Sequence, residues 1–342
     1  MASLHRFNDA FWGAYLLLIF LPLIIKPFPY RSLFFAPILA LTAYVLCTTT
    51  TGTYNGDYHL ALGWLTLFCS ASDYIVFTDV QRTLRRVSLN PAVPPPDSGP
   101  IEDASLWRRV WWAAALLGSP RGVGWSHEPV SALPPHPSAS TPKFTFVSQR
   151  LARAVGFFLL HDACNLHRFI VGASWGMSAY TALVIGTSIL SAGSVALGFS
   201  GPEEWPPLFG GPREARSIRR FWGRAWHQLM RRARPLFLLN RSSLCTGSTS
   251  HTMCSALAFF MLQACAITLE DLLIFLGKRA GMRESRATRA VGYAWTWAWF
   301  ALVLPVCQVP LVRAGLMEEA LPVSVLAGLW RGEWVLEPRE GR

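Results

Sequence analysis

The stretch FIVGASWGMSAYTALVIGTSILSAGSVALGF, at residues 169–199, contains no charged side chain and is rich in small residues. A helix needs about 20 mostly apolar residues to cross the hydrocarbon core of a bilayer, so this stretch is long enough to span a membrane. Because backbone groups in lipid must satisfy their own hydrogen bonds, the segment is expected to be an α-helix. It therefore predicts a membrane protein.

Further apolar runs lie on both sides of this stretch, and they contain few or no charges. These runs are residues 11–25, 33–47, 59–77, 154–165, 252–276 and 290–312. Three of them, at 11–25, 33–47 and 154–165, are short for a full span, so they need flanking aromatic residues, a shallow position or a re-entrant path. We predict an all-α, polytopic integral membrane protein with about seven transmembrane helices, in a range of roughly six to nine, forming a single domain over residues 1–342.

The composition of the whole chain agrees with this prediction. Hydrophobic residues make up 52% of the chain and charged residues only 15%, a balance that argues against a pair of soluble domains. The run at residues 11–25 has the position of a signal peptide. However, Lys26-Pro27 follows it and no small-residue cleavage site is present, so a first transmembrane helix is favoured.

The positive charges are distributed unevenly between the connecting loops. No Lys or Arg occurs in residues 47–59, whereas arginines occur in the Pro-rich loop at residues 88–143 and in the loop and arginine-rich helix expected at residues 201–234. Positively charged loops favour the cytosolic side, so both segments are predicted to face the cytosol. The basic cluster at residues 278–289 is expected there too. Only one strong apolar run separates this cluster from the arginine-rich helix. If both face the cytosol, residues 235–250 must dip into or cross the membrane, which puts His251 near the side opposite the cytosol.

Residues 217–232, SIRRFWGRAWHQLMRR, combine arginine, tryptophan and one histidine without any acidic residue. In a helix, Ile218, Trp222, Trp226 and Leu229 share one apolar face, with arginines over much of the remainder. Two interpretations stay open: an interfacial helix that binds anionic lipid, or a surface on which arginine forks bind the phosphates of a large anionic cofactor. Nucleic-acid binding is not favoured, because membrane runs flank the segment.

Ionisable residues inside apolar runs are costly in lipid, and they mark candidate functional sites. The pair His161-Asp162 is one such site, although a structural hydrogen bond between helices is the favoured interpretation. Glu270-Asp271 is interpreted as the end of an apolar helix at the cytosolic surface of the membrane, or as an acidic partner of Arg279 or of the arginine segment. The seven cysteines show no CxxC pair and no Cys/His metal spacing, so no metal site is predicted.

Five stretches, taken in chain order, resemble one family of membrane enzymes. They are SASDYIVFTDVQRTLRR (residues 70–86), LLGSPRGVGWSHEP (116–129), FFLLHDACN (157–165), SIRRFWGRAWHQLMRR (217–232) and FFMLQACAITLEDLL (259–273). The fourth contains Phe-Trp-Gly-Arg-x-Trp-His-Gln, which looks like the signature of the wax-synthase-like branch of the membrane-bound O-acyltransferases. Within this branch, the chain most resembles the fungal acetyltransferases of terpenoid and meroterpenoid pathways.

The resemblance implies transfer of an acyl group, here an acetyl group, from the co-substrate acyl-coenzyme A to a hydroxyl of a lipophilic secondary metabolite. It also implies a multi-pass protein of the endoplasmic reticulum, with no bound cofactor. An alcohol is a weak nucleophile at neutral pH, so a base must take its proton as it attacks the thioester, and histidine suits this task. The family pattern carries two polar positions, which His227 and His251 match, and we expect both to be catalytic. The residues expected to bind coenzyme A are Arg220, Trp222, Arg224 and Trp226.

The match at His251 departs from the family pattern. Family members tend to end an apolar stretch with Ser-Gly-x-x-His, whereas SSLCTGSTSHT (residues 242–252) is polar and places Gly247 one position earlier. Either the loop has drifted while His251 kept its place, or the enzyme is impaired in this stretch. Two alternatives to the acetyltransferase stay open: a wax-ester-type long-chain acyltransferase, and a non-enzymatic membrane transporter or scaffold. No internal repeat supports a transporter.

Overall fold

The structure is a computed structural model that describes residues 4–90, 92–93, 99–166, 171–229, 249–313, 324–332 and 334, without the side chains of 165–166, 171–175, 249–257 and 310–313. The chain forms two compact units, Met1–Ser131 with Leu229–Thr246, and Ala132–Gln228 with Gly247–Arg342. The single domain expected over residues 1–342 stays a prediction. The described part is mostly helical, with two very short strands, and this confirms the all-α prediction.

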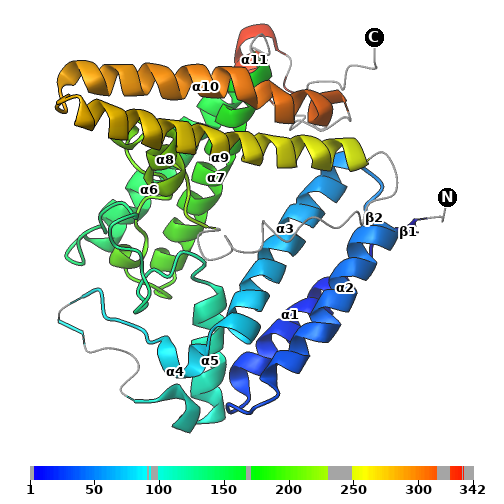
Figure 1. Cartoon of the computed structure of the whole chain (residues 1–342). Helices are drawn as coiled ribbons and strands as arrows, with labels where there is room; N and C mark the ends of the chain where they lie inside the picture. Colours follow the sequence, from blue (N-terminus) through cyan, green and yellow to red (C-terminus); the bar gives the residue numbers. More distant parts are fainter. Residues whose placement is uncertain are drawn as a thin grey trace. The chain divides into compact units, whose positions relative to one another are not determined.

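The first unit contains three apolar helices, α1 (Ala10–Ile24), α2 (Phe35–Thr48) and α3 (Tyr54–Ser72), which lie side by side (Figure 1). Its other elements are α4 (Val80–Thr83), α5 (Leu106–Leu117), the helical turns η1 (Arg31–Phe34), η2 (Asp73–Phe77) and η3 (Ile101–Asp103), and the paired strands β1 (His5–Arg6) and β2 (Thr49–Thr50). Tyr15, Ile38 and Trp64, one from each apolar helix, are fully buried in a shared core. The Tyr15 hydroxyl also forms a hydrogen bond with Thr42 Oγ1 at 2.9 Å, which joins α1 to α2.

Gln81 of α4 closes the C-terminal end of α1. Its Nε2 donates to the carbonyl oxygens of Leu23 at 2.6 Å and Ile25 at 2.8 Å. The last carbonyl groups of a helix have no partner within the helix, so this amide satisfies groups that would otherwise be unpaired. The stretch at residues 70–86 is thereby fastened to the first helix of the unit.

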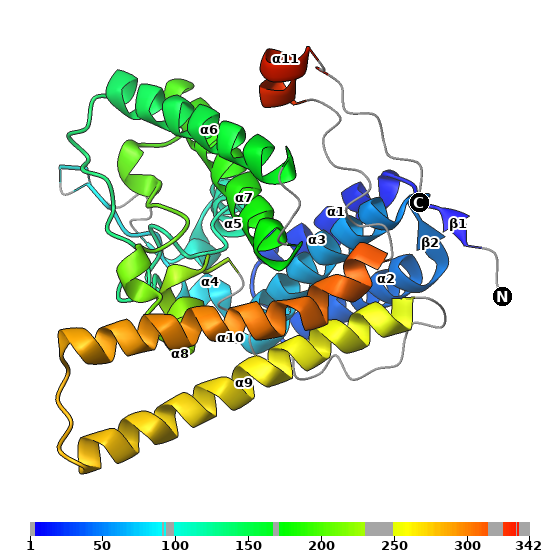
Figure 2. The ribbon, with the colours of Figure 1, turned by 90° about the horizontal axis from the view of Figure 1, so that it is seen from above.

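The second unit holds the signature segment. Its elements are α6 (Lys143–Leu166), α7 (Val171–Ala196), the turns η4 (Pro202–Glu204) and η5 (Pro212–Glu214), α8 (Ile218–Arg220), the π-helical turn η6 (Phe221–Ala225), α9 (Thr249–Arg279), α10 (Arg286–Arg313) and α11 (Val325–Arg331). Figures 1 and 2 show α9 and α10 lying side by side, and α6 packs along α7. Phe259 of α9 and Phe300 and Val303 of α10 form the buried centre between the long pair, with Trp222 packed against them.

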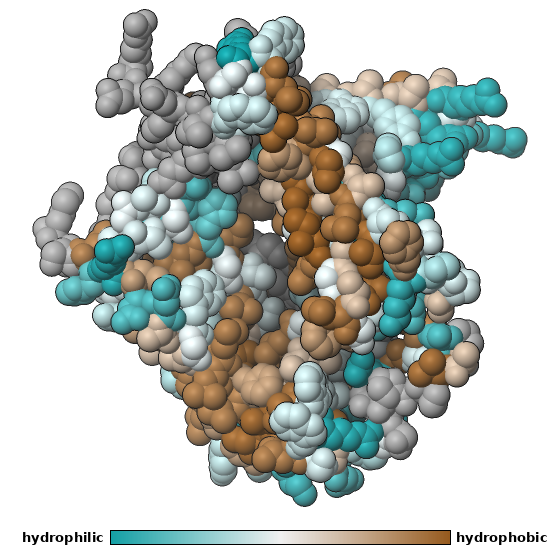
Figure 3. Space-filling model, turned by 180° about the vertical axis from the view of Figure 1, so that it is seen from behind, coloured by the Kyte–Doolittle hydropathy of each residue, from teal (hydrophilic) through white to brown (hydrophobic). Residues whose placement is uncertain are grey.

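Five helical stretches of the described part are long and apolar enough to cross a membrane: Arg31–Thr48, Tyr54–Phe77, Gly176–Ala196, Ala258–Arg279 and Arg286–Val309. The helix α1 is apolar but shorter, and the run at residues 154–165 is the second half of α6. On α9, Leu272, Leu273 and Phe275 are exposed. Figure 3 shows broad hydrophobic areas on the molecular surface, as expected where helices face lipid. These features support a polytopic membrane protein.

Candidate active site

The segment SIRRFWGRAWHQLMRR begins as a helix that ends at Ala225, about halfway along it. The short α8 passes directly into the π-helical turn η6, and Trp226 is extended, with φ −76° and ψ 155°. The prediction that Ile218, Trp222, Trp226 and Leu229 share one helix face is therefore wrong. Gln228 explains where the helix ends, because its Nε2 donates to the carbonyl oxygens of Trp222 at 3.0 Å and Trp226 at 2.7 Å. A side-chain partner for these carbonyls replaces the next turn of backbone hydrogen bonds.

Two acidic residues of α9 hold the start of this segment. Glu270 is only 6% exposed, and its carboxylate accepts hydrogen bonds from the backbone N–H groups of Ile218 at 2.8 Å and Arg219 at 3.2 Å. The first N–H groups of a helix have no partner within the helix, so Glu270 acts as a cap supplied from elsewhere in the chain. Asp271 accepts a hydrogen bond from Arg219 Nε at 3.1 Å. Glu270-Asp271 is thus a partner of the arginine segment, one of its expected roles.

Arg220 and Arg224 converge on Glu214, at the end of the preceding turn η5. Arg220 donates a hydrogen bond to the Glu214 carboxylate, and Arg224 Nη1 lies 3.7 Å from the same oxygen. Arg216 pairs in a similar way with Glu284, and this hydrogen bond holds the pKa of Glu284 below its usual range. The two arginines expected to bind phosphate therefore already face a carboxylate. If a phosphate binds these arginines, it has to share them with Glu214 or displace it.

The loop before the segment packs directly on the segment's backbone. The Gly210 N–H donates to the carbonyl oxygen of Ala225 at 2.9 Å. A Cβ atom at Gly210 would overlap the backbone carbonyl group of Arg224, so only glycine permits this close approach. The Tyr293 hydroxyl of α10 donates to the carbonyl oxygen of Arg213 at 3.1 Å, which ties the same loop to α10.

His227 lies beside a wall of aromatic rings. Trp226 stacks on Phe221 with ring centroids 5.6 Å apart, and Trp222 lies edge-on to Trp226 at 6.1 Å. The His227 ring is 5.3 Å from Trp226 and 5.9 Å from Phe209. The structure therefore brings together three of the predicted site residues, Trp222, Trp226 and His227.

His251 lies in the first turn of α9, and its side chain is outside the described residues. Most of residues 235–250, predicted to dip into or cross the membrane, is also outside them. Because an α-helix rises by about 1.5 Å per residue, His251 lies about 28 Å along α9 from Glu270. The predicted base and the arginine segment are thus well separated along one helix.

His161 and Asp162 each make a hydrogen bond that joins two elements. His161 Nδ1 is 2.8 Å from Thr181 Oγ1 of α7, and Asp162 accepts a hydrogen bond from the Leu326 N–H of α11 at 2.9 Å. This is the structural role favoured from the sequence. Among the described residues, no three His, Cys, Asp or Glu side chains gather as metal ligands do.

Known proteins match this part of the chain, and two of them match most of the rest as well. The sequence model described as "Membrane bound O-acyl transferase family" matches residues 205–267. Acetyltransferase eriL of Hericium erinaceus is 32% identical, over 90% of this chain and 92% of the relative. Acetyltransferase ple2 of Rhodocybe pseudopiperita is 30% identical, over 93% of this chain and 95% of the relative.

The chain belongs to the membrane-bound O-acyltransferase family. This confirms the resemblance found in the sequence and makes the chain an acyltransferase, which sets aside the transporter and the scaffold. A membrane-bound O-acyltransferase of this kind uses acyl-coenzyme A as its co-substrate. A further relative, from Penicillium terrestre, is named O-mevalon transferase macI and is 33% identical over 40% of this chain and 38% of its own length. No solved structure matches the chain.

The family match contains two residues that sequence reasoning missed. Glu214 faces the arginines, and Gln263 of α9 accepts hydrogen bonds from two tryptophans. Gln263 is the one polar residue in FFMLQACAI, residues 259–267, and such a position in a membrane run is a signal of a buried hydrogen bond. Glu214 offers no comparable signal, because acidic residues are common in loops.

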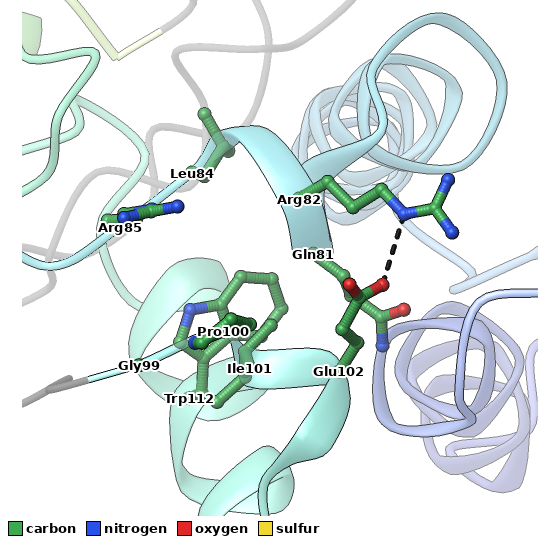
Figure 4. Close-up of a pocket in the computed structure, with 9 residues that line it drawn as sticks. All are labelled: Gln81, Arg82, Leu84, Arg85, Gly99, Pro100, Ile101, Glu102 and Trp112. Atoms are coloured by element: carbon green, nitrogen blue, oxygen red, sulfur yellow. Dashed lines mark hydrogen bonds and ion pairs between the residues drawn. The ribbon is translucent and has the colours of Figure 1, made fainter.

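A cavity of about 270 Å³ in the first unit involves none of the predicted site residues. Figure 4 shows Leu84 and Arg85 on one side of it and Trp112 with Pro100 on the other. Arg82, at its edge, donates from Nε to Glu102 at 3.0 Å. The cavity belongs to the stretch that carries the family's 70–86 motif, and no predicted function uses it.

Proposed function

We propose that this acyltransferase moves an acetyl group from acetyl-coenzyme A to a hydroxyl of a lipophilic alcohol of terpenoid or meroterpenoid type, in the endoplasmic reticulum membrane. Acetyl is supported by the relatives named acetyltransferases, which align with nearly the whole chain. The observation that carries the proposal is the signature segment itself. It is fixed to α9 by Glu270 and presents Arg220, Arg224 and His227 within one short stretch.

In the proposed reaction, the oxygen of the acceptor hydroxyl attacks the thioester carbonyl carbon, and His251 takes the hydroxyl proton at the same time. The tetrahedral intermediate then collapses, the carbon–sulfur bond breaks, and the coenzyme A thiolate leaves. A lipophilic acceptor reaches a base most easily inside the membrane, so His251 suits it better than a residue beside the arginines. His227 serves the thioester end of the donor, and Arg220 and Arg224 bind the nucleotide phosphates by charge-assisted hydrogen bonds.

The test of the base is turnover by purified variants at equal protein level, followed by release of free thiol and by mass analysis of the acetylated product. His251→Ala should lower kcat by about 10²–10⁴-fold, which is the usual contribution of a general base. Membrane insertion and acetyl-coenzyme A binding should persist. His227→Ala should lower the rate less. Near-normal turnover by His251→Ala would rule out this assignment.

The test of the phosphate site is Arg224→Ala. Loss of a hydrogen bond to a charged group costs about 1.5–3 kcal/mol, so KM for acetyl-coenzyme A should rise roughly ten- to hundredfold. Trp297 of α10 is exposed, and Trp297→Ala provides a surface control that should leave KM unchanged. An unaltered KM in Arg224→Ala would show that the phosphates bind elsewhere.

Acyl length is tested with the same protein. Acetyl-coenzyme A should be used in preference to long-chain acyl-coenzyme A, and the reverse preference would support the wax-ester-type alternative. The relative named O-mevalon transferase makes this comparison necessary, because its name gives a different transferred group.

A further inference from the structure

The cavity in the first unit is lined by two hydrogen-bond donors that have no acceptor in the described part of the chain. Trp112 of α5 is only 2% exposed, and its indole N–H makes no hydrogen bond there. Buried indole N–H groups usually find a partner, so this one calls for a ligand. The Arg85 side chain, the second donor, extends toward the space beside the Trp112 ring, whose nitrogen lies on the edge nearer to it (Figure 4). Both donors therefore face the same part of the cavity.

The charges of the lining leave one arginine unpaired. The charged residues around the cavity are Arg82, Arg85 and Glu102. Arg82 Nε donates to the Glu102 carboxylate at 3.0 Å, so these two charges balance each other. Arg85 has no carboxylate partner among the described residues, and the buried side chains of Leu84 and Ile101 add apolar walls. One free guanidinium, one neutral donor and apolar walls suit an anion of single charge, and a phosphodiester is such an anion.

The cavity lies where a membrane-spanning segment ends. Residues 54–77 form an apolar span, and Arg82 and Arg85 follow it closely in the chain. The helix α5 presents Trp107 and Trp111 on another face, where they are 67% and 60% exposed. Tryptophans with an exposed ring are typical of the headgroup level of a bilayer. Both observations place the cavity beside lipid headgroups, which are the nearest source of a phosphodiester.

The size of the cavity separates it from the site proposed for the acyl donor. Its volume is about 270 Å³. Sites for drug-sized ligands span about 300–1,000 Å³, so this cavity suits one headgroup better than a whole coenzyme A. None of the residues proposed for the donor lines it.

We propose that this cavity binds the phosphate of a phospholipid headgroup, with the Arg85 guanidinium and the Trp112 indole N–H donating to the phosphate oxygens. The acyl chains of the lipid then lie in the bilayer. The proposal does not depend on the proposed function, because acyl transfer uses none of these residues.

Two substitutions test the donors in the full-length protein in detergent, with a fluorescent phosphatidylglycerol as the probe. Arg85→Gln should raise the Kd of the probe about tenfold, the usual effect of losing a hydrogen bond between charged groups. Trp112→Phe keeps a ring and removes only the N–H, so it should raise the Kd about three- to tenfold. If Trp112→Phe does not fold, the Arg85→Gln result decides alone.

Matched controls come from the neighbouring positions, which do not line the cavity. Arg86→Gln removes the same charge, and Trp111→Phe removes an indole N–H from the exposed face of α5. Both should leave the Kd unchanged. An equal loss of binding in Arg86→Gln and Arg85→Gln would show general attraction to surface charge and would overturn the proposal.

Competition identifies the source of the phosphate. Unlabelled phosphatidylglycerol should displace the probe, whereas diacylglycerol, which lacks the phosphate, and inorganic phosphate should not. Displacement by inorganic phosphate would mean that the cavity takes free phosphate and would overturn the lipid assignment, and displacement by diacylglycerol would exclude phosphate recognition. KM for acetyl-coenzyme A should stay unchanged in Arg85→Gln. A tenfold rise in that KM would assign the cavity to the acyl donor instead.

Discussion

Replacement of Glu214 by Gln should make the enzyme bind acetyl-coenzyme A more tightly. The Glu214 carboxylate lies against Arg220 and within 3.7 Å of Arg224, the two arginines proposed for the phosphates. A phosphate that binds there has to compete with this internal anion. Gln has nearly the same shape but no charge, so the arginines should become available at little steric cost.

The size of the expected change in KM depends on how far Glu214 and its two arginines are shielded from water. An exposed ion pair contributes about 0.2–1 kcal/mol, whereas a hydrogen bond to a charged group contributes about 1.5–3 kcal/mol. Glu214 and Arg220 are each 30% exposed and Arg224 is 44% exposed. We therefore assign about 1 kcal/mol to the competition, at the weaker end because water reaches all three groups. About 1.4 kcal/mol corresponds to a tenfold change in affinity, so KM for acetyl-coenzyme A should fall about fivefold.

The assay is thiol release at varied acetyl-coenzyme A and saturating alcohol, together with a direct binding measurement, since KM equals the dissociation constant only when chemistry is slow. Glu284→Gln is the control. It removes the same charge from a carboxylate that pairs with Arg216 and Arg289 instead, so it should leave KM nearly unchanged. A KM that stays constant or rises in Glu214→Gln would refute the reasoning, as would an equal fall in both variants.

Three further outcomes test other parts of the structure. A cysteine introduced at Ser217 should be labelled from the cytosolic side of sealed microsomes, because arginine-rich loops favour that side, and purely lumenal labelling would contradict this. His161→Asn should keep near-normal turnover and lose only a little thermal stability, because it replaces one interhelical hydrogen bond to Thr181; a dead but folded protein would point to catalysis. Glu270→Ala should lower the unfolding free energy by about 3 kcal/mol in a detergent melt, since two backbone N–H groups lose a charged acceptor, and an unchanged melting temperature would argue against that capping role.

The helices of this protein were largely predictable from the sequence because length and composition decide them. Residues 176–196 and 258–279 are apolar over a bilayer's thickness, and lipid leaves the backbone few alternatives to a helix. The favoured role of His161-Asp162 was also predictable, because a buried polar pair needs partners.

The geometry of the signature segment was not predictable in the same way. Its helix ends early because of the Gln228 amide, and its start is capped by Glu270, which is 52 residues away from Ile218 in the chain. Helical periodicity contains no information about such distant partners. Gln263 was visible as a polar residue in an apolar run, but its role depends on Trp222 and Trp299, which come from two other elements.

The contact of Gly210 with the backbone of Arg224 and Ala225 limits how this enzyme can be recombined with its relatives. A side chain at position 210 collides with a backbone carbonyl, so no replacement of the Arg224 side chain can relieve it. Chimeric enzymes with a junction between these positions should work only if both parents keep glycine and the same local path. If junctions are placed before residue 205 or after residue 229, Gly210 and Arg224 come from the same parent and the contact is preserved. Libraries that seek a new acceptor alcohol should therefore keep position 210 invariant and vary residues elsewhere.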